Sequence, residues 1–185
     1  MRTTRMVRVP GHSGTRRLTA VAAVLVLGGA AGAFPSAAFA SPAPVWAKQD
    51  PASHPRAGAA GAMTYDAATG TVVMYGGSIF HGGTFTWDGS TWTKQTPAAH
   101  PAPREGASMA YDAATESTVV FGGDNLRNVL SDTWTWDGST WTKQAGTHPS
   151  ARVFAPMAYD AATGTAVLFG GTVPGNELDD TWTWG

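Results

Sequence analysis

Cysteine is absent from this sequence of 185 residues, and charged residues make up only 14% of it. Without cysteine the chain has no disulfide and no thiolate metal ligand, so a stable fold must come from a packed core. The histidines and acidic residues also form no cluster with the spacing of metal ligands. We therefore expect neither a bound metal nor a cofactor.

Acidic residues are missing from the first 40 positions, which carry a basic start instead. The basic residues there are Arg2, Arg5, Arg8, Arg16 and Arg17. An apolar stretch follows from Leu18 to Ala33, and Ala38-Phe39-Ala40 has the small-x-small pattern of a cleavage site. This order predicts a secretory signal over residues 1–40, cleaved after Ala40, and a secreted, extracellular protein. The apolar stretch is short, which disfavours a retained membrane anchor. Thr15–Leu18 weakly resembles a twin-arginine signal, so the export route stays open.

Residues 41–185 contain few basic residues. Five of the 12 basic residues precede residue 41, so residues 41–185 keep seven beside all 13 acidic ones, a formal net charge of −6. Nucleic acids and anionic lipid surfaces both favour basic partners. We therefore expect no nucleic-acid partner, and no stable membrane insertion after signal cleavage.

A repeated pattern fills the rest of the chain. Tyr65–Gly70 recurs as Tyr111–Glu116 and Tyr159–Gly164, with tyrosines 46 and 48 residues apart. Each copy leads into a short apolar run and a glycine pair; the pairs are Gly76-Gly77, Gly122-Gly123 and Gly170-Gly171. A fixed period of this size indicates a repeat architecture. In the second copy Glu116 replaces the turn glycine, so that turn must differ or accept strain.

Each repeat reads as a meander of up to four short antiparallel strands, which we call a, b, c and d. The apolar, β-branched and alternating runs predict them at 61–66, 71–75, 84–87 and 91–94, then 109–112, 117–121, 133–136 and 140–143, then 157–160, 165–169 and 181–184. Asp-Gly pairs between c and d are strong hairpin signals. Val45–Gln49 matches the d segments in its Trp, Lys and Gln, so the order is d, abcd, abcd, abc. We expect an all-β fold whose last sheet is completed by the N-terminal strand.

The motif order resembles the kelch repeat. It runs Arg, Met-x-Tyr-Asp, Phe/Tyr-Gly-Gly, Asp-Thr-Trp-x-Trp and Trp-Thr-Lys over nearly all of Val45–Gly185. The form is similar to that of secreted bacterial proteins like the propeller domain of galactose oxidase. The resemblance implies a β-propeller region over 41–185, with blades at about 57–95, 105–144 and 153–184 plus 45–49. It also implies that strand a lines a central channel, that the glycine pairs allow close backbone approach, and that tryptophans pack between blades.

The catalytic chemistry of galactose oxidase does not follow from this resemblance. That chemistry requires copper and a tyrosine cross-linked to a cysteine, and this chain has no cysteine. The repeated tyrosines Tyr65, Tyr111 and Tyr159 are more simply packing residues. Asp179-Asp180 could form a calcium pair, but Asp180 matches Asp132 as a repeat residue before strand c, which favours a capping or turn role.

Two sets of residues could bind a ligand. Arg56, Arg104 and Arg152 each precede a strand a and could converge as an anion-binding ring at the channel mouth. The simpler interpretation is an inter-blade hydrogen bond or salt bridge, with Glu105 or a turn aspartate as partner. The histidines before them (54, 100 and 148) are placed for outer loops, which disfavours a metal site.

The second set lies in the b–c loops, which vary where the strands do not. These loops are 78–82, 124–131 and 172–179, and the candidate ligand-binding residues on them are Ile79, Phe80, His81, Asn125, Leu126 and Arg127. Their alternative role is that of solvated connections.

Two functions therefore remain open. The favoured one is a secreted, non-enzymatic module that recognises a protein or a glycan through the b–c loops and the channel mouth. The alternative is an extracellular galactose-oxidase-like enzyme, or a subunit of one, whose cofactor or partner is not evident in the chain. Three blades are too few for an ordinary ring. We consider a homodimer forming a six-bladed ring, in which strand d at Trp46 of each chain completes the third blade of the other. The alternatives are a partial propeller docked on another protein, or a truncated gene product.

Overall fold

The computed structural model describes residues 44–80 and 82–185. The predicted signal segment at 1–40 and the candidate residue His81 lie outside the described residues. The chain divides into Met1–Val45 and a compact unit, Trp46–Gly185, and the fold below is that of the second unit. Its described residues form strands, turns and loops. Among them no helix has the length and apolarity to cross a membrane.

The first sheet is a four-stranded antiparallel meander. It contains β1 (Gly61–Asp66), β2 (Thr71–Gly76), β3 (Thr84–Trp87) and β4 (Trp92–Gln95), in spatial order β1-β2-β3-β4. The β3–β4 turn forms as its Asp-Gly sequence predicts: the amides of Ser90 and Thr91 each donate to Asp88 Oδ1 at 2.8 Å, and Gly89 takes a φ of 97°.

The second sheet repeats this meander, and the third stops one strand short. The second contains β5 (Ser108–Asp112), β6 (Ser117–Phe121), β7 (Thr133–Trp136) and β8 (Trp141–Lys143). The third contains β9 (Met157–Asp160), β10 (Thr165–Phe169) and β13 (Thr181–Trp184), in spatial order β13-β10-β9. A small hairpin, β11 (Thr172–Val173) with β12 (Asn176–Glu177), lies in the connection between β10 and β13. The all-β prediction is therefore confirmed.

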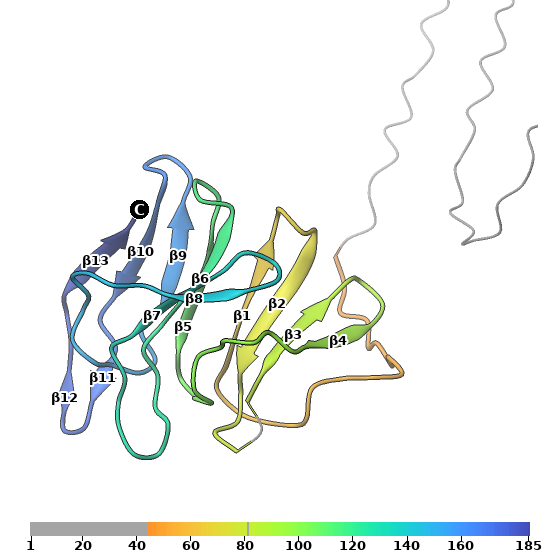
Figure 1. The fold of residues 1–185 in the computed structure, drawn as a ribbon, viewed down its shortest axis with the longest axis horizontal. Coiled ribbons are helices and arrows are strands. Elements are labelled where there is room, and N and C mark those ends of the chain that lie inside the picture. The colour runs from red at the N-terminus through yellow and green to blue at the C-terminus, as the bar shows by residue number, and fades with distance from the viewer. Residues whose placement is uncertain (1–43, 81) are drawn as a thin grey trace, which may run out of the picture. The chain divides into compact units, whose positions relative to one another are not determined.

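One expectation fails within the single chain. Residues 45–49 form no strand and are exposed, so the third sheet is not completed by the N-terminal segment. The chain continues from that segment into the first sheet. Ser53, in this connection, donates a hydrogen bond to the Trp92 carbonyl oxygen of β4 at 2.5 Å. The second sheet lies between the first and the third (Figure 1), which separates the segment from β13.

The three sheets lie side by side, with their first strands β1, β5 and β9 next to one another (Figure 1). One core cluster joins the first two sheets and includes Val73, Tyr75, Met109, Val120, Trp136 and Trp141. A smaller cluster of Phe121, Ala155 and Leu168 joins the second and third. Tryptophan thus packs between neighbouring sheets, as the repeat predicts.

The glycine pairs allow the close approach that was expected of them. A Cβ atom on Gly76 would come within 2.6 Å of the Arg104 carbonyl oxygen, and one on Gly122 within 2.6 Å of the Arg152 carbonyl oxygen. Any side chain at these two positions would therefore push the next sheet away. Each also has a positive φ, of 82° and 66°, which favours glycine independently of the contact.

A chain of backbone hydrogen bonds ties the three sheets together just before β1, β5 and β9. The Phe154 amide donates to the Gly106 carbonyl at 2.8 Å, and the Gly106 amide donates to the Ala60 carbonyl at 2.9 Å. The three residues are equivalent in the repeat and share a positive φ of 58°, 63° and 56°. The same backbone hydrogen bond therefore joins the first sheet to the second and the second to the third.

Candidate functional site

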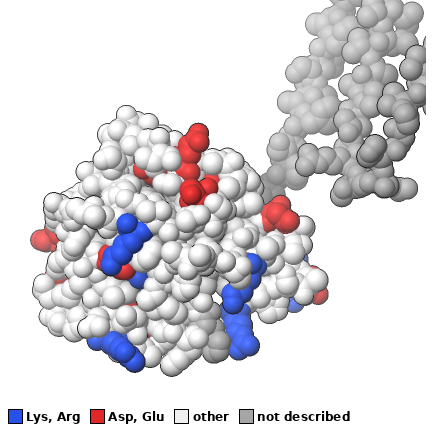
Figure 2. Space-filling view, in the orientation of Figure 1, with Lys and Arg blue, Asp and Glu red and all other residues white. Residues whose placement is uncertain are grey.

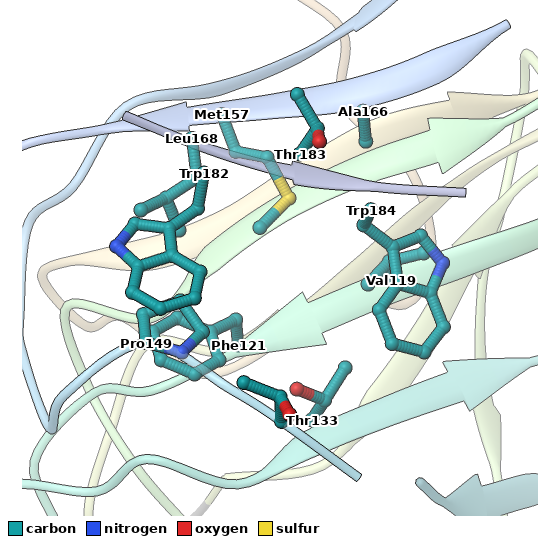
Figure 3. Close-up of a pocket in the computed structure, with 11 residues that line it drawn as sticks. Val119, Phe121, Thr133, Pro149, Met157, Ala166, Leu168, Trp182, Thr183 and Trp184 are labelled. Carbon is teal, nitrogen blue, oxygen red and sulfur yellow. The ribbon is translucent and has the colours of Figure 1, made fainter. Parts of the chain in front are cut away.

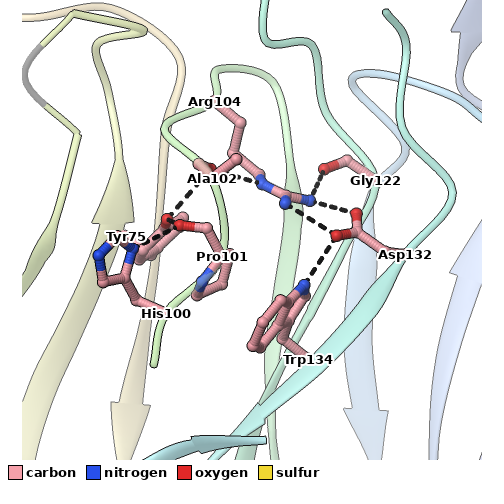
Figure 4. A network of polar contacts seen from close by, with 8 residues as sticks. All are labelled: Tyr75, His100, Pro101, Ala102, Arg104, Gly122, Asp132 and Trp134. Carbon is pink, nitrogen blue, oxygen red and sulfur yellow. Dashed lines mark hydrogen bonds and ion pairs between the residues drawn. The ribbon is translucent and has the colours of Figure 1, made fainter. Parts of the chain in front are cut away.

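Arg104 is held inside the protein by the second repeat. Its side chain is 1% exposed, and its guanidinium forms a two-pronged ion pair with Asp132, with Nη1–Oδ1 at 2.6 Å and Nη2–Oδ2 at 3.0 Å (Figure 4). Nη1 also donates to the Gly122 carbonyl at 2.9 Å, and Nε donates to the Ala102 carbonyl at 3.0 Å. Trp134 Nε1 also donates to Asp132 Oδ2, at 2.7 Å. The Arg104 guanidinium is therefore buried and paired within its own repeat, and it is not available to a ligand.

Arg152 repeats this arrangement in the third repeat. It is 1% exposed and pairs with Asp180, with Nη1–Oδ1 at 2.5 Å and Nη2–Oδ2 at 2.9 Å. Nη1 donates to the Gly170 carbonyl at 2.8 Å, and Trp182 Nε1 donates to Asp180 at 2.6 Å. The Asp180 side chain is more exposed than that of Asp132, 42% against 20%.

The carboxyl groups of both pairs are held in their charged form. The hydrogen bond from Arg152, followed by that from Trp182, holds the pKa of Asp180 well below its ordinary value. Burial opposes ionisation of Asp132, but the hydrogen bonds from Arg104 and Trp134 outweigh burial and lower its pKa. These are permanent ion pairs at neutral pH.

The anion-binding ring considered for the three arginines does not form, whereas the salt bridge favoured as the simpler interpretation is present for Arg104 and Arg152. Arg104 and Arg152 are buried and paired inside their own repeats, and their partners are Asp132 and Asp180 rather than Glu105 or a turn aspartate. The calcium and capping roles considered for Asp180 give way to this ion pair as well.

Arg56 is not the counterpart of these two arginines. The His-Pro pairs align Gly58, not Arg56, with Arg104 and Arg152. In the first repeat Gly83 stands in place of the aspartate and Phe85 in place of the tryptophan, so all three members of the ion-pair network are absent together. A Cβ atom on Gly58 would lie 1.9 Å from the Gly77 carbonyl oxygen, so here the chain closes onto the glycine pair instead.

Arg56 instead borders an open hollow of about 560 Å³ on the outer side of the first sheet. The hollow is lined by Ser53, His54, Arg56, Phe80, Gly82, Phe85, Trp92 and Lys94. It combines basic and aromatic side chains, and it brings together two of the predicted site residues, Arg56 and Phe80. Figure 2 shows one face of the molecule, which is mostly uncharged and carries a few separate acidic and basic groups.

The three histidines make the same local contact. In each His-Pro pair the ring Nδ1 lies 2.8–3.0 Å from the carbonyl oxygen of the following proline: His54 with Pro55, His100 with Pro101, and His148 with Pro149. Within residues 44–80 and 82–185, no group of three or more His, Asp or Glu residues is placed to hold a metal ion.

Two of the tyrosines join neighbouring sheets, whereas Tyr65 is 58% exposed. Tyr111 accepts a hydrogen bond from the Ala68 amide at 3.1 Å, which joins the second sheet to a turn of the first. Tyr75 of β2 is buried and donates to the Pro101 carbonyl in the segment that leads to β5 (Figure 4). Burial raises the pKa of the Tyr75 hydroxyl far above its usual range, although the charge of Arg104 opposes this.

The second b–c loop displays its candidate residues on a rigid turn. Asn125 Oδ1 accepts from the amides of Arg127 at 3.1 Å and Asn128 at 2.9 Å, and Asp124 Oδ1 accepts from the Leu126 amide at 2.5 Å. Leu126 has a φ of 71° and is 62% exposed. Asn125 is therefore occupied within the loop, while Leu126 and Arg127 face outward.

The loops are also fastened at their base. Glu105 and Asp124 exchange two backbone hydrogen bonds, at 2.9 and 3.0 Å, and Val153 and Thr172 do the same at the same lengths. The second and third b–c loops are thus each tied to the residues that precede strand a of the same repeat.

Phe154 is the exposed residue that sequence reasoning missed. It is 62% exposed, although its φ is 58°, a conformation that bulky side chains rarely adopt. Its ring lies over Gly106, where an added Cβ atom would come within 2.8 Å of it. The repeat offered a signal, since the equivalent positions hold the small residues Ala60 and Gly106.

No family model and no curated protein sequence matches the chain. Ninety-four chains of solved structures match it. One of them, titled "Structure of YjhT", is 16% identical, with a TM-score of 0.49, and the match covers 67% of this chain and 42% of that one. The chain therefore spans about two fifths of the length of that structure.

Proposed function

We propose that residues 41–185 form a secreted, kelch-type set of β-propeller blades that binds a protein or glycan ligand without catalysing a reaction. The repeated four-stranded meanders and the adjacency of β1, β5 and β9 support the propeller assignment, because strand a is innermost in such folds. The basic and apolar N-terminal segment supports secretion.

The ligand surface in this proposal is the end of the sheets where strand a begins and strand b finishes. Phe154 lies there, and the b–c loops leave the sheets at the same end, fastened by the two backbone bridges. Leu126 and Arg127 add an apolar and a basic group. Rigid loops of this kind lose little conformational freedom on binding.

Phe154 is the single observation that carries the proposal. Holding a non-glycine residue at positive φ costs on the order of 1 kcal/mol or more. A phenylalanine there gains little from burial, because its side chain is mostly in solvent. Exposed aromatic rings on rigid backbones serve well as binding anchors, since they offer a large apolar face to a sugar ring or to a protein side chain.

The substitution Phe154→Gly tests this function directly. Glycine stands at the equivalent position 106 with a φ of 63°, so the variant should fold at least as well as the natural chain. We expect binding to a glycan or protein ligand, identified on arrays of glycans and extracellular proteins, to weaken at least about 30-fold.

Tyr65→Ser is the matched control. Tyr65 is an exposed aromatic, 58% exposed, near the opposite end of its strand. It should leave the affinity unchanged. Unaltered affinity in Phe154→Gly would show that this surface is not the binding site.

A further inference from the structure

A pocket opens between the second and third sheets, beside β13. It is lined by Val119, Phe121, Thr133, Met157, Leu168, Trp182 and Trp184, among others (Figure 3). The rings of Trp182 and Trp184 stand at opposite ends of it. Apolar side chains contributed by two sheets thus face a space that the described chain leaves open.

The same position between the first and second sheets is filled by Trp141 of β8. Its indole packs against Tyr75 and Trp136 with ring centroids 5.3 Å apart in each case. Its Nε1 donates to Thr84 Oγ1 at 2.7 Å. Trp141 is 1% exposed, so the strand d tryptophan completes this interface.

The partners of Trp141 all have counterparts around the open pocket. By repeat position, Tyr75 corresponds to Phe121, Thr84 to Thr133, and Trp136 to Trp184, and each counterpart lines the pocket. The Thr133 hydroxyl has no hydrogen bond within the described part of the chain, whereas that of Thr84 accepts from Trp141. The pocket therefore has the walls of a tryptophan site and lacks the tryptophan.

We propose that Trp46 of a second copy of this chain occupies this pocket, as part of a fourth strand beside β13. Val45–Gln49 shares Trp, Lys and Gln with the segments that form β4 and β8, and Trp46 is fully exposed. The register of β7 with β8 pairs Trp136 with Trp141 and Thr135 with Thr142. Transferred to β13, it places Trp46 opposite Trp184 and Ala47 opposite Thr183.

The backbone chain before β1, β5 and β9 supplies an independent reason for a second copy. Phe154 donates to Gly106 and Gly106 to Ala60, which leaves the Ala60 amide and the Phe154 carbonyl without hydrogen bonds within the described residues. A second copy related by two-fold symmetry presents its Phe154 carbonyl to the first copy's Ala60 amide, and the reverse. The chain of bonds then closes into a ring of six.

The outer faces of the first and third sheets match the two sides of the interface that already exists between the first and second sheets. Met63 on the first sheet corresponds to Met109, which is buried between the first two sheets, and Met63 is 59% exposed. Phe169 on the third sheet corresponds to Tyr75, buried at the same interface, and is 51% exposed. The outer faces of the first and third sheets thus each carry one side of an interface that already exists inside the chain. In a two-fold dimer, the first sheet of each copy packs against the third sheet of the other.

A designed disulfide tests the register, because the chain has no cysteine of its own. We expect Ala47→Cys with Thr183→Cys, in the protein purified after export, to form a covalent dimer on oxidation, seen as twice the chain mass in a non-reducing gel. Ala47→Cys with Thr135→Cys is the matched control. Thr135 is already paired with Thr142, so this pair should stay uncross-linked.

Three results overturn the proposal: a disulfide closed within one chain, no disulfide, or equal cross-linking in the control pair. The first would show that a chain completes its own third sheet. None of them bears on what the loops bind, which the Phe154 variant tests separately.

Sedimentation velocity measures the contribution of the tryptophan site. We expect Trp46→Ala to raise the dimer dissociation constant at least about 30-fold, and Thr133→Val to raise it about fivefold through loss of one hydrogen bond. Thr84→Val is the control, since it removes the equivalent bond inside one chain and should leave the dimer intact. A monomeric natural chain, open filaments, or equal effects of the two threonine variants would refute the proposal.

Discussion

Arg104 and Asp132 illustrate at the scale of single residues how the repeats are stabilised. The buried guanidinium is tolerated because the Asp132 carboxylate balances its charge and the two side chains take part in five hydrogen bonds. All of these partners belong to the second repeat. Removing one partner leaves the other charge without compensation, which costs far more than the intact pair contributes.

We therefore expect Arg104→Ala to lower the free energy of unfolding by about 3–5 kcal/mol, measured by urea titration. Arg152→Ala should cost less, because Asp180 is 42% exposed and water can solvate the carboxylate that remains. Arg127→Ala, on an exposed loop, is the control and should change stability by less than about 0.5 kcal/mol. Equal losses in the two buried variants would contradict the role assigned to exposure.

Sequence reasoning recognised that these arginines could be structural, but it could not find their partners. Asp132 lies 28 positions after Arg104, and Asp180 lies 28 positions after Arg152, so each pair joins the segment before strand a to the residue before strand c, a contact that local sequence pattern does not reveal. Arg56 also precedes a strand a, so its position alone groups it with Arg104 and Arg152. The contacts show that the arginine, aspartate and tryptophan positions of the repeat form one network, which Gly58, Gly83 and Phe85 remove from the first repeat. Phe154 was missed for a similar reason, since exposure and φ are properties of the fold.

At the scale of elements, the turn between strands a and b shows what one residue changes in a repeated unit. Gly70 and Gly164 take φ values of 68° and 70°, and Glu116 takes 51° at the equivalent position. The expectation that this turn must differ or accept strain is resolved: the turn is kept, and Glu116 adopts the left-handed conformation.

We expect Glu116→Gly to stabilise the protein by up to about 1 kcal/mol, because the relief of backbone strain exceeds the added freedom of the unfolded chain. Gly70→Ala is the reciprocal test. A Cβ atom there would meet nothing within 4 Å, so its expected cost of about 1 kcal/mol comes from φ alone. Thermal and urea unfolding measure both changes, and a destabilised Glu116→Gly variant would contradict the strain argument.

The strands themselves were largely predictable. β1, β3, β6, β7, β9, β10 and β13 begin and end where the alternating and β-branched runs placed them. β2, β5 and β8 differ by one residue at one end, and β4 is shifted by one residue at both ends. Local pattern sufficed because each strand is bounded by a turn with its own sequence signal. The hairpin of β11 and β12 was not predicted, although Pro174-Gly175 is a turn signal, because its two-residue strands are too short to show alternation.

At the scale of the whole molecule, the sequence indicates that a fourth strand belongs beside β13 but not which chain supplies it. The order of strands within the repeats can be read from the sequence, whereas the sheet that residues 45–49 join depends on which strand edge they can reach. In the single chain, residues 45–49 stay on the side of the first sheet, and both outer faces remain partly exposed.

This arrangement predicts a melting temperature that depends on protein concentration. If two copies complete each other, association stabilises the folded state by mass action, and each tenfold increase in concentration should raise the melting temperature by a few degrees. Trp46→Ala should abolish this dependence. Thr84→Val should lower the melting temperature at every concentration yet keep the dependence, since its lost bond lies within one chain. A melting temperature that stays constant over a 100-fold range of natural protein would mean that the exposed tryptophan segment contributes nothing to the stability of a second copy.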